Sequence, residues 1–151
     1  MYKQILVTLD QSALAERALP HAVAIAKAFG ATVHLVSVVP VLDAETMIAA
    51  GIAVDWEGQT QTAREYMGGI RKRVMSDGVE AEWDVCQGDI AEEILRYCEQ
   101  QDCDLICMCT HGRSGLGRWV YGSIADRVLR HAQVPVLLVR SAERGTEVAD
   151  G

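Results

Sequence analysis

Hydrophobic residues of this chain form short continuous runs that alternate with sparser stripes of helical spacing. Continuous apolar runs are typical of strands covered on both faces. They occur at residues 5–9, 32–39, 105–109 and 136–139, with an alternating strand pattern at 80–85. Apolar positions three and four residues apart predict amphipathic helices between the strands, with stripes at Leu14, Ala18, Ala22, Ile25 and Phe29, at Ala63, Met67, Ile70 and Val74, and at Ile90, Ile94, Leu95 and Cys98. Such alternation predicts an α/β fold, with helices on both faces of a parallel sheet.

Residues with special backbone or capping properties mark the ends of several elements. Gly30 is placed to end the first helix, and Pro20 inside that helix predicts a kink or an irregular first turn. Asp89 and Glu92 have the spacing of a capping box at the start of a later helix. The segment 41–61 has no clear period and is expected to hold a short helix or a mobile excursion.

Two loops at one edge of the expected sheet carry the residues suited to chemistry. The first follows the first strand at residues 10–12, where Asp10 and Ser12 also offer helix caps. The second follows the fourth strand, re-enters a helix at Gly122-Ser123, and contains Gly112, Gly115, Gly117, Gly122, Arg113 and Arg118. If the first and fourth strands are neighbours, the loops face each other across the cleft where such sheets bind ligands. Glycines and a helix start favour an anion, so the second loop predicts a nucleotide-phosphate site. The G-x-x-x-x-G-K-[ST] motif of common NTPases is absent.

Composition narrows the class of protein. The chain has 151 residues, of which 50% are hydrophobic and 23% charged, which suits one globular domain at 1–141 followed by a polar tail at 142–151. Its formal net charge of -7 argues against nucleic-acid binding, which needs a basic face. No apolar run is long enough for a membrane span and no signal-peptide pattern is present. We therefore expect a cytoplasmic protein without membrane insertion.

Five cysteines are present, at positions 86, 98, 103, 107 and 109. The odd number argues against a disulfide framework in such a chain, and Cys107 and Cys109 are expected to be small apolar fillers of a buried strand. A metal or redox site formed by Cys103, Cys107, Cys109 and His111 is the less favoured interpretation, because zinc sites usually show tighter paired spacings.

The glycine loop and its surroundings resemble the universal stress protein family over nearly the whole chain. The family hallmark is Gly-x-x-Gly, nine residues, then Gly-[Ser/Thr]; here Gly112 is followed after nine residues by Gly122-Ser123. The opening Ile-Leu-Val-Thr-Leu-Asp-Gln-Ser and the segment Val-Leu-Arg-His-Ala-Gln-Val-Pro-Val-Leu-Leu-Val are also similar. Cys109 stands where the family has its first glycine. The resemblance implies a Rossmann-like sandwich, similar to the adenine nucleotide alpha hydrolases, with strand order 3-2-1-4-5.

The resemblance also implies an ATP site, which we carry over residue by residue. ATP, or AMP or ADP, is expected with Mg²⁺ or Mn²⁺, and Asp10 would contact the ribose or the metal. The complete expected set is Thr8, Leu9, Asp10, Val38, Cys109, His111, Gly112, Arg113, Ser114, Gly115, Gly122, Ser123 and Ile124. Structural alternatives are helix capping for Asp10 and Ser123, core packing for Val38 and a hinge role for His111. Cys109 is expected to weaken binding. The favoured interpretation of its thiol is a buried, inert group; the alternative is a thiol whose pKa is lowered by the helix start and the arginines and which responds to oxidation.

Three functions are compatible with these residues. The leading one is an ATP-binding regulator of the stress response, with a protein partner that the sequence leaves unknown. The second is a slow ATPase or phosphotransferase, although no catalytic base is identifiable, so we expect at most very slow hydrolysis. The third is a nucleotide-free dimeric adaptor. The last strand is expected at the edge of the sheet and consists of Val136, Leu137, Leu138 and Val139. The resemblance implies a homodimer that forms through this strand.

Overall fold

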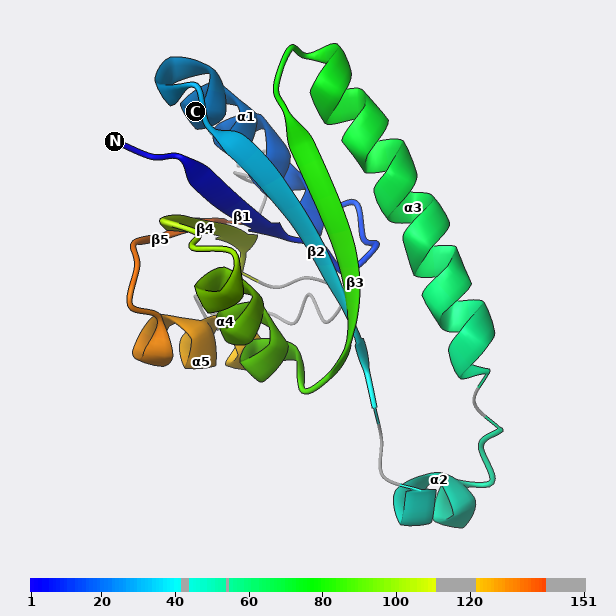
Figure 1. Ribbon diagram of the computed structural model, residues 1–151. Coiled ribbons are helices and arrows are strands. Elements are labelled where there is room, and N and C mark those ends of the chain that lie inside the picture. Colours follow the sequence, from blue (N-terminus) through cyan, green and yellow to red (C-terminus); the bar gives the residue numbers. More distant parts are fainter. Residues whose placement is uncertain (42–43, 54, 111–121, 141–151) are drawn as a thin grey trace, which may run out of the picture.

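A five-stranded parallel sheet forms the centre of the molecule (Figure 1). The computed structural model describes residues 1–41, 44–53, 55–110 and 122–140. The strands are β1 (Gln4–Thr8), β2 (Thr32–Pro40), β3 (Ala81–Gly88), β4 (Leu105–Cys109) and β5 (Val136–Val139). All adjacent pairs are parallel and the order is β3-β2-β1-β4-β5. The expected fold class and strand order are confirmed, and β1 and β4 are neighbours.

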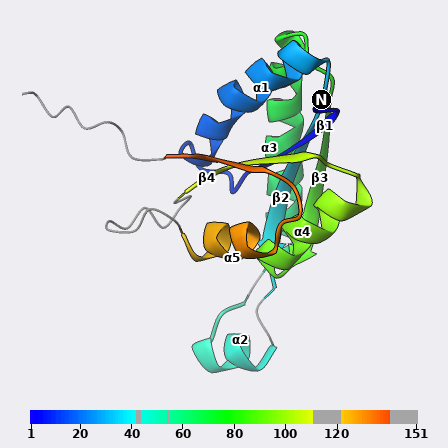
Figure 2. The same ribbon diagram turned by 90° about the vertical axis from the view of Figure 1, so that its left-hand side faces the viewer.

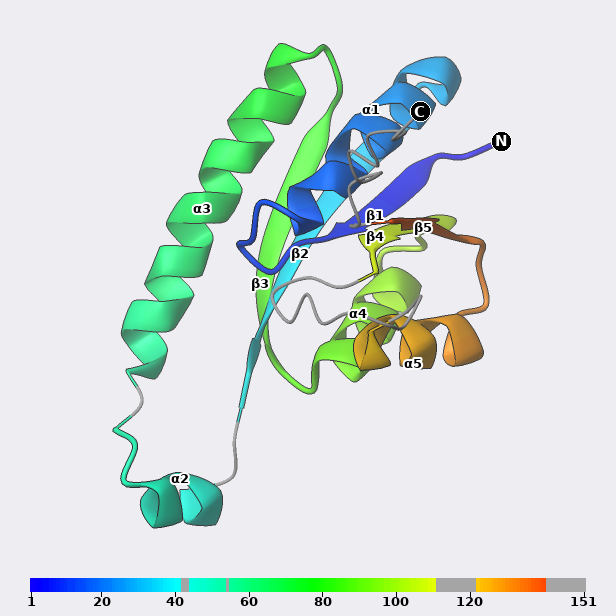
Figure 3. The same cartoon turned by 180° about the vertical axis from the view of Figure 1, so that it is seen from behind.

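Helices cover both faces of the sheet (Figure 2). A single 3₁₀ turn, Ala15–Arg17, leads into α1 (Ala18–Phe29); the other helices are α2 (Ala44–Ala50), α3 (Trp56–Ser76), α4 (Ile90–Gln100) and α5 (Ser123–His131). In the described chain, α1 and α3 pack on one face and α4 and α5 on the other. The view from behind shows α1 and α3 on their shared face (Figure 3), while α2 lies apart from the sheet (Figure 1).

Two apolar cores result from this arrangement. Ile5, Val7 and Cys107 point to the α1/α3 side, whereas Leu6 and Ile106 point to the α4/α5 side. Both sets are almost completely buried, because successive residues of a strand point to opposite faces and both faces are covered. Burial of each such side chain contributes about 1.5–3 kcal/mol, which explains why the strands read as continuous apolar runs.

The helix stripes are confirmed for α3 and partly wrong for α1. Ala63, Met67, Ile70 and Val74 are all buried. In the first helix, the buried residues are Ala15, Ala18, Leu19, Ala22, Val23 and Ala26, while Phe29 is 46% exposed and meets the ring of Tyr2 edge-on. Ala18, Ala22 and Ile25 keep the expected face toward the core, whereas Phe29 is the last residue of α1, directly before the left-handed Gly30, and lies at the exposed end of the helix.

Pro20 lies in the first turn of α1, where a missing N–H breaks no intrahelical hydrogen bond. The expected irregular first turn is therefore confirmed as the 3₁₀ segment. Gly30 ends α1 in the left-handed region with a φ of 68°, and the carboxylate of Asp89 caps α4 by accepting from the N–H of Glu92 at 3.0 Å, as expected.

Two other expectations at helix starts need correction. Ser123 is the first residue of α5, and the capping position belongs to Gly122. The expected cap role of Ser123 is wrong by one position, because Gly122 takes up the extended conformation that a cap residue needs. Asp10 does not cap α1 directly; it accepts hydrogen bonds from the N–H and hydroxyl of Ser12, and the Ser12 oxygen accepts from the N–H of Ala15 at 3.1 Å.

The segment 41–61 contains a short helix, α2, and then the beginning of α3, which Asp55 caps by accepting from the N–H of Gly58 at 2.9 Å.

Within the described residues, the helices are too short or too polar to span a lipid bilayer. The polar tail at 142–151 lies outside the described residues, and the cytoplasmic localisation stays a prediction.

Candidate functional site

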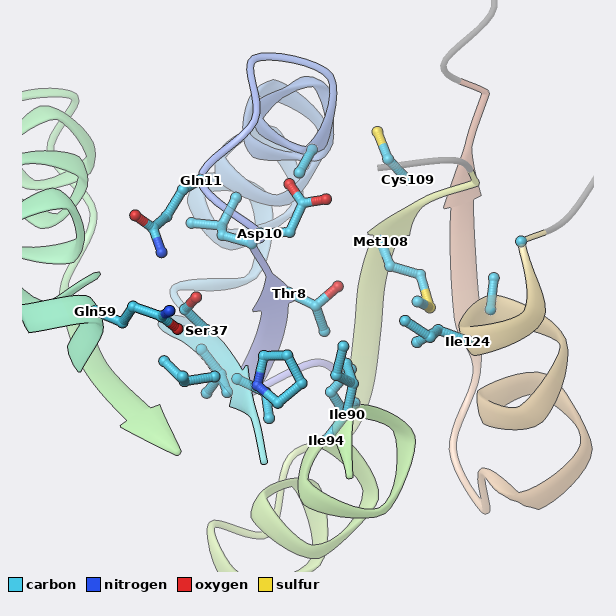
Figure 4. A pocket seen from close by; sticks show the side chains of 18 of the residues that line it. Thr8, Asp10, Gln11, Ser37, Gln59, Ile90, Ile94, Met108, Cys109 and Ile124 are labelled. Atoms are coloured by element: carbon cyan, nitrogen blue, oxygen red, sulfur yellow. The ribbon is translucent and has the colours of Figure 1, made fainter. Parts of the chain in front are cut away.

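A cavity of about 760 Å³ opens at the carboxyl ends of β1, β2 and β4 (Figure 4). The starts of α3, α4 and α5 and the loop after β1 complete its walls. Its described lining consists of Thr8, Leu9, Asp10, Gln11, Ala15, Val36, Ser37, Val38, Val39, Pro40, Asp55, Gly58, Gln59, Thr62, Ile90, Ile94, Met108, Cys109, Thr110, Gly122, Ser123, Ile124 and Ala125. Its position matches the place where open parallel sheets bind ligands, and its size is within the range for a small-molecule site.

The cleft brings together every expected site residue that the structure describes. These are Thr8, Leu9, Asp10, Val38, Cys109, Gly122, Ser123 and Ile124. The other expected residues, His111, Gly112, Arg113, Ser114 and Gly115, lie outside the described residues. The loops that are distant in the sequence therefore meet, because β1 and β4 pair directly from Ile5 with Leu105 to Val7 with Cys107.

The two sides of the cleft differ in polarity. Ile90, Ile94, Met108 and Ile124 lie on the α4/α5 side, while Gln11, Ser37 and Gln59 lie on the α3 side (Figure 4). Thr8 lies between these sides (Figure 4). A flat ring system can pack on the apolar side, and hydroxyl or amide groups can be recognised on the polar side.

Asp10 is held in place by its own loop. Its Oδ1 atom accepts hydrogen bonds from the N–H of Ser12, at 3.0 Å, and from the Ser12 hydroxyl. Between them, Gln11 has a φ of 67°, a conformation that costs energy for a non-glycine residue and that occurs often at ligand sites. The loop thus fixes a carboxylate at the mouth of the cleft.

The start of α5 is joined to the end of β4 through backbone hydrogen bonds. The N–H of Gly122 donates to the carbonyl of Thr110 at 2.7 Å, and the N–H of Thr110 donates to the carbonyl of Val139 at 3.1 Å. Ser123, Ile124 and Ala125, the first three residues of α5, line the cleft. N–H groups at a helix start have no partner inside the helix and favour an anion.

A protein-family model described as the universal stress protein family matches residues 1–140. The chain belongs to this family. It is 33% identical over 148 residues to universal stress protein MJ0531 of Methanocaldococcus jannaschii, covering 95% of this chain and 85% of that one. The solved structure of protein MJ0577 superimposes with a TM-score of 0.79 at 29% identity, covering 95% of this chain and 99% of that one.

Two further solved universal stress proteins are complexes with a nucleotide. One is in complex with cAMP, with a TM-score of 0.64 and 21% identity over 93% of this chain and 98% of that one. The other, from Archaeoglobus fulgidus, is in complex with dAMP, with a TM-score of 0.65 and 22% identity over 91% of this chain and 97% of that one. At these identities the likeness shows the shared fold alone.

Cys109 in this universal stress protein is a buried thiol that packs on the α1/α3 side. Its Sγ–H donates to the carbonyl of Leu14 at 2.9 Å. Burial raises the pKa of Cys109, and this effect outweighs the opposing influence of the Ala18 N–H and Arg17. The expectation of a lowered pKa is therefore wrong, and the interpretation as a buried thiol fits better.

Several lining residues of this universal stress protein were not expected from its sequence. Ile90 and Ile94 fit a core stripe equally well, and Ser37 lies inside a strand. Gln59 lies in the segment 41–61 without a readable period, and Thr62 follows directly after it. Gln11, next to Asp10 in the first loop, and Thr110, at the start of the second loop, had positions that could have suggested their role.

The described residues do not by themselves form a metal site. Among the described residues, no group of three or more histidine, cysteine, aspartate or glutamate side chains could hold an ion. The interpretation with Cys103, Cys107, Cys109 and His111 finds no support in the three of these residues that are described. The charged residues of the described lining are Asp10 and Asp55, and Asp55 is engaged as the cap of α3.

Proposed function

We propose that this universal stress protein binds an adenine nucleotide, ATP, ADP or AMP, in the cleft and acts as a nucleotide-dependent regulator in the stress response. The observation that carries the proposal is the meeting of three features in one cavity: an apolar side, the carboxylate of Asp10 and the start of α5. A nucleotide has a flat ring, a sugar with hydroxyl groups and an anionic chain, and each feature suits one of these parts.

The parts of the nucleotide are assigned by chemistry. The adenine ring would pack against Val38 and the isoleucines of α4, where it loses contact with water. The ribose hydroxyls would donate to Asp10, whose carboxylate is a strong acceptor. The phosphates would accept from the N–H groups of Ser123 and Ile124 at the positive end of α5.

The solved complexes with cAMP and dAMP agree with this proposal at the level of the ligand class. Mg²⁺ or Mn²⁺ would enter with the phosphates and use Asp10 as a single protein ligand, which suits Mg²⁺ because it usually keeps several waters and binds through one or two carboxylates plus phosphate.

A regulator is favoured over an enzyme by the side chains of the cleft. The described lining has no histidine or lysine that could act as a base, and its two carboxylates are engaged by Ser12 and Gly58. Phosphoryl transfer needs a positioned nucleophile and charge stabilisation. A steady-state hydrolysis assay distinguishes the regulator from a slow ATPase, and the nucleotide recovered from freshly purified protein distinguishes both from a nucleotide-free adaptor.

Isothermal titration with ATP, ADP, AMP and adenosine tests the site. We expect Ser123→Asp to weaken ATP binding about tenfold or more, equivalent to at least about 1.4 kcal/mol, because its carboxylate would lie beside the phosphates. The fold should be preserved, since Ser123 is exposed and an acidic residue is favourable at a helix start.

Two controls sharpen this titration. Gln133→Glu adds the same charge beyond the other end of α5 and should leave affinity unchanged, and adenosine should bind Ser123→Asp as well as the parent protein. Absence of ATP binding by the parent protein would refute the proposed function. Unchanged ATP affinity in Ser123→Asp would refute the phosphate position alone.

We also propose a homodimer through β5, an edge strand with β4 as its sheet neighbour in the described chain. Its four residues are only partly buried, with Leu138 and Val136 packed toward the α4/α5 core and Leu137 and Val139 toward the other. An apolar edge with unpaired backbone groups is usually covered in native proteins.

Light scattering coupled to gel filtration measures this association. We expect a dimer mass for the parent protein at micromolar concentration and a monomer mass for a folded Leu138→Lys protein, because a charge at this partly buried position would lose contact with water when a second copy covers β5. Gln133→Lys, which adds the same charge at an exposed position, should remain a dimer. A monomeric parent protein, or a dimeric Leu138→Lys, would contradict the proposal.

A further inference from the structure

Two cysteines lie close together at the end of α4. This end of the helix is next to the start of β4, on the opposite end of the sheet from the cleft. After Gln100 the chain turns through Gln101 and Asp102 into Cys103. The N–H of Cys103 donates to the carbonyl of Cys98 at 2.9 Å, and the N–H of Asp102 donates to the carbonyl of Glu99 at 3.2 Å. Asp102 has a φ of 51°. These features define a Schellman motif, in which the residues at the positions of Cys98 and Cys103 contact each other.

The contacting pair consists of thiols in place of the apolar side chains usual in this motif. The Cys98 Sγ–H donates to the carbonyl of Cys103 at 3.6 Å, so the thiol of Cys98 points toward the backbone of Cys103. Cys98 is 7% exposed and Cys103 is 4% exposed. Both side chains belong to the α4/α5 core, immediately below the surface turn at Gln101 and Asp102.

We propose that Cys98 and Cys103 form a reversible dithiol–disulfide pair that is oxidised by hydroperoxides. A disulfide needs two cysteines whose Cα atoms are about 4.4–6.8 Å apart and whose side chains point toward each other. The backbone hydrogen bond between the same two residues holds their main chains together, and the hydrogen bond from the Cys98 thiol to the Cys103 carbonyl turns the Cys98 side chain toward its partner. The motif is therefore preorganised for the bond.

The arrangement also assigns an order to the chemistry. The hydrogen bond from Cys103 stabilises the thiolate of Cys98 and lowers its pKa, whereas the same hydrogen bond and burial raise the pKa of Cys103. The Cys98 thiolate would attack the terminal oxygen of the hydroperoxide, break the O–O bond and form a sulfenic acid, releasing an alcohol or water after protonation. Cys103 sulfur would then attack Cys98 sulfur; the S–O bond breaks, and hydroxide leaves as water with the Cys103 proton. The two thiols supply two electrons to the peroxide.

The other cysteines lack this arrangement. Burial raises the pKa of Cys107 to about 12 and also raises the pKa of Cys109. The pKa of Cys86 is raised to about 11, mainly by burial. A thiolate is the species that reacts with peroxide, so these three thiols are expected to react more slowly in the folded protein.

Peptide mapping tests the proposal on the full chain. Native protein is treated with hydrogen peroxide, remaining thiols are blocked with iodoacetamide, and the chain is cut after arginine and before aspartate. Because cuts after Arg96 and before Asp102 and Asp104 separate the two cysteines, the disulfide would join peptide 97–101 to peptide 102–103. We expect this joined pair, two hydrogens lighter than its reduced parts, and its loss on treatment with dithiothreitol.

Variants identify the role of each thiol. Cys103→Ser should accumulate a sulfenic acid at Cys98 that dimedone traps, Cys98→Ser should lose the crosslink, and Cys86→Ser should form it at the parent rate. Circular dichroism checks that each variant is folded. If a serine variant does not fold, the peptide map of the oxidised parent protein tests by itself whether the Cys98–Cys103 disulfide forms. A native protein that oxidises first at Cys86 or in peptide 104–113, or that gives sulfinic acid without the crosslink, would overturn the proposal.

Discussion

Gly122→Val is expected to destabilise the fold by about 1–3 kcal/mol, the usual range for overpacking, and to abolish nucleotide binding in the cleft. A Cβ atom at Gly122 would lie 2.8 Å from the carbonyl oxygen of Thr110, closer than side chains tolerate. Because that carbonyl accepts the Gly122 N–H, any shift that relieves the contact also displaces the start of α5. The glycine is therefore needed for its small size, since its φ of -68° suits any residue.

Gly69→Ala is the matched control, because a Cβ at this exposed position of α3 would have nothing within 4 Å. Replacement of a glycine inside a helix by alanine should stabilise the protein by about 0.5–1 kcal/mol. Urea unfolding measures both variants, and we expect free energies of unfolding that change in opposite directions. A Gly122→Val protein as stable as its parent would contradict the steric role of this position.

His34→Leu is expected to cost about 1–3 kcal/mol, because it removes the partner of two polar side chains inside the protein. His34 is 3% exposed. Its Nε2 lies 2.6 Å from the Gln4 Oε1, and its Nδ1 lies 3.1 Å from the Tyr97 hydroxyl. These partners assign a neutral ring, with the proton on Nε2 donated to Gln4 and Nδ1 accepting from Tyr97. Tyr97→Phe removes only one of the bonds and should cost less.

The same histidine gives a pH dependence with a defined sign. Burial lowers the pKa of His34, and the carboxylate of Glu82, 3.9 Å from Nδ1, opposes that effect only partly. The unfolded chain therefore takes up a proton more readily than the native protein. The neutral His34 ring contributes its full stabilisation of the native protein above about pH 6.5, the approximate pKa of histidine in the unfolded chain. This stabilisation is lost as the pH falls from that value through the lower pKa of His34 in the native protein.

Urea unfolding of the parent protein and His34→Leu between pH 7.5 and 5 measures this contribution. The parent protein should lose stability as the pH falls through this range, and the variant should lose less. Equal slopes for the two proteins would show that His34 is not the group responsible.

The fold could be predicted from the sequence because its strands are covered on both faces. The continuous apolar run from Leu105 to Cys109 predicted a buried strand. Because a glycine-containing loop follows this strand, the candidate site was expected at the carboxyl ends of the strands. The position of residues 8–10 and 122–124 in the cleft could be predicted for the same reason, because each lies at a strand end or a helix start. Asp89 was a correct cap because capping depends on neighbouring residues only.

The remaining features depend on contacts that local sequence does not determine. Gln59 and Thr62 reach the cleft because α3 packs along β2 and β3, and nothing in their own segment indicates that neighbour. Phe29 was assigned to the core because it continues the stripe of Ala18, Ala22 and Ile25, but packing of the other elements determines how far the core extends along α1. The pKa of Cys109 was judged from nearby arginines in the sequence, whereas burial determines its direction.

The pairing of β1 with β4 has a consequence for the way the chain is made. Residues Thr8 and Ile124 lie on the same cleft, yet at about 5–20 residues per second the ribosome needs about 6–23 s to proceed from one to the other. During that time β1 has β2 as a neighbour but an unpaired opposite edge, a surface prone to unwanted strand pairing. A nucleotide cannot protect this intermediate, because the start of α5 has not been synthesised. Ligand binding would therefore stabilise only the finished chain, and the free edge of β1 stays uncovered until β4 has been made.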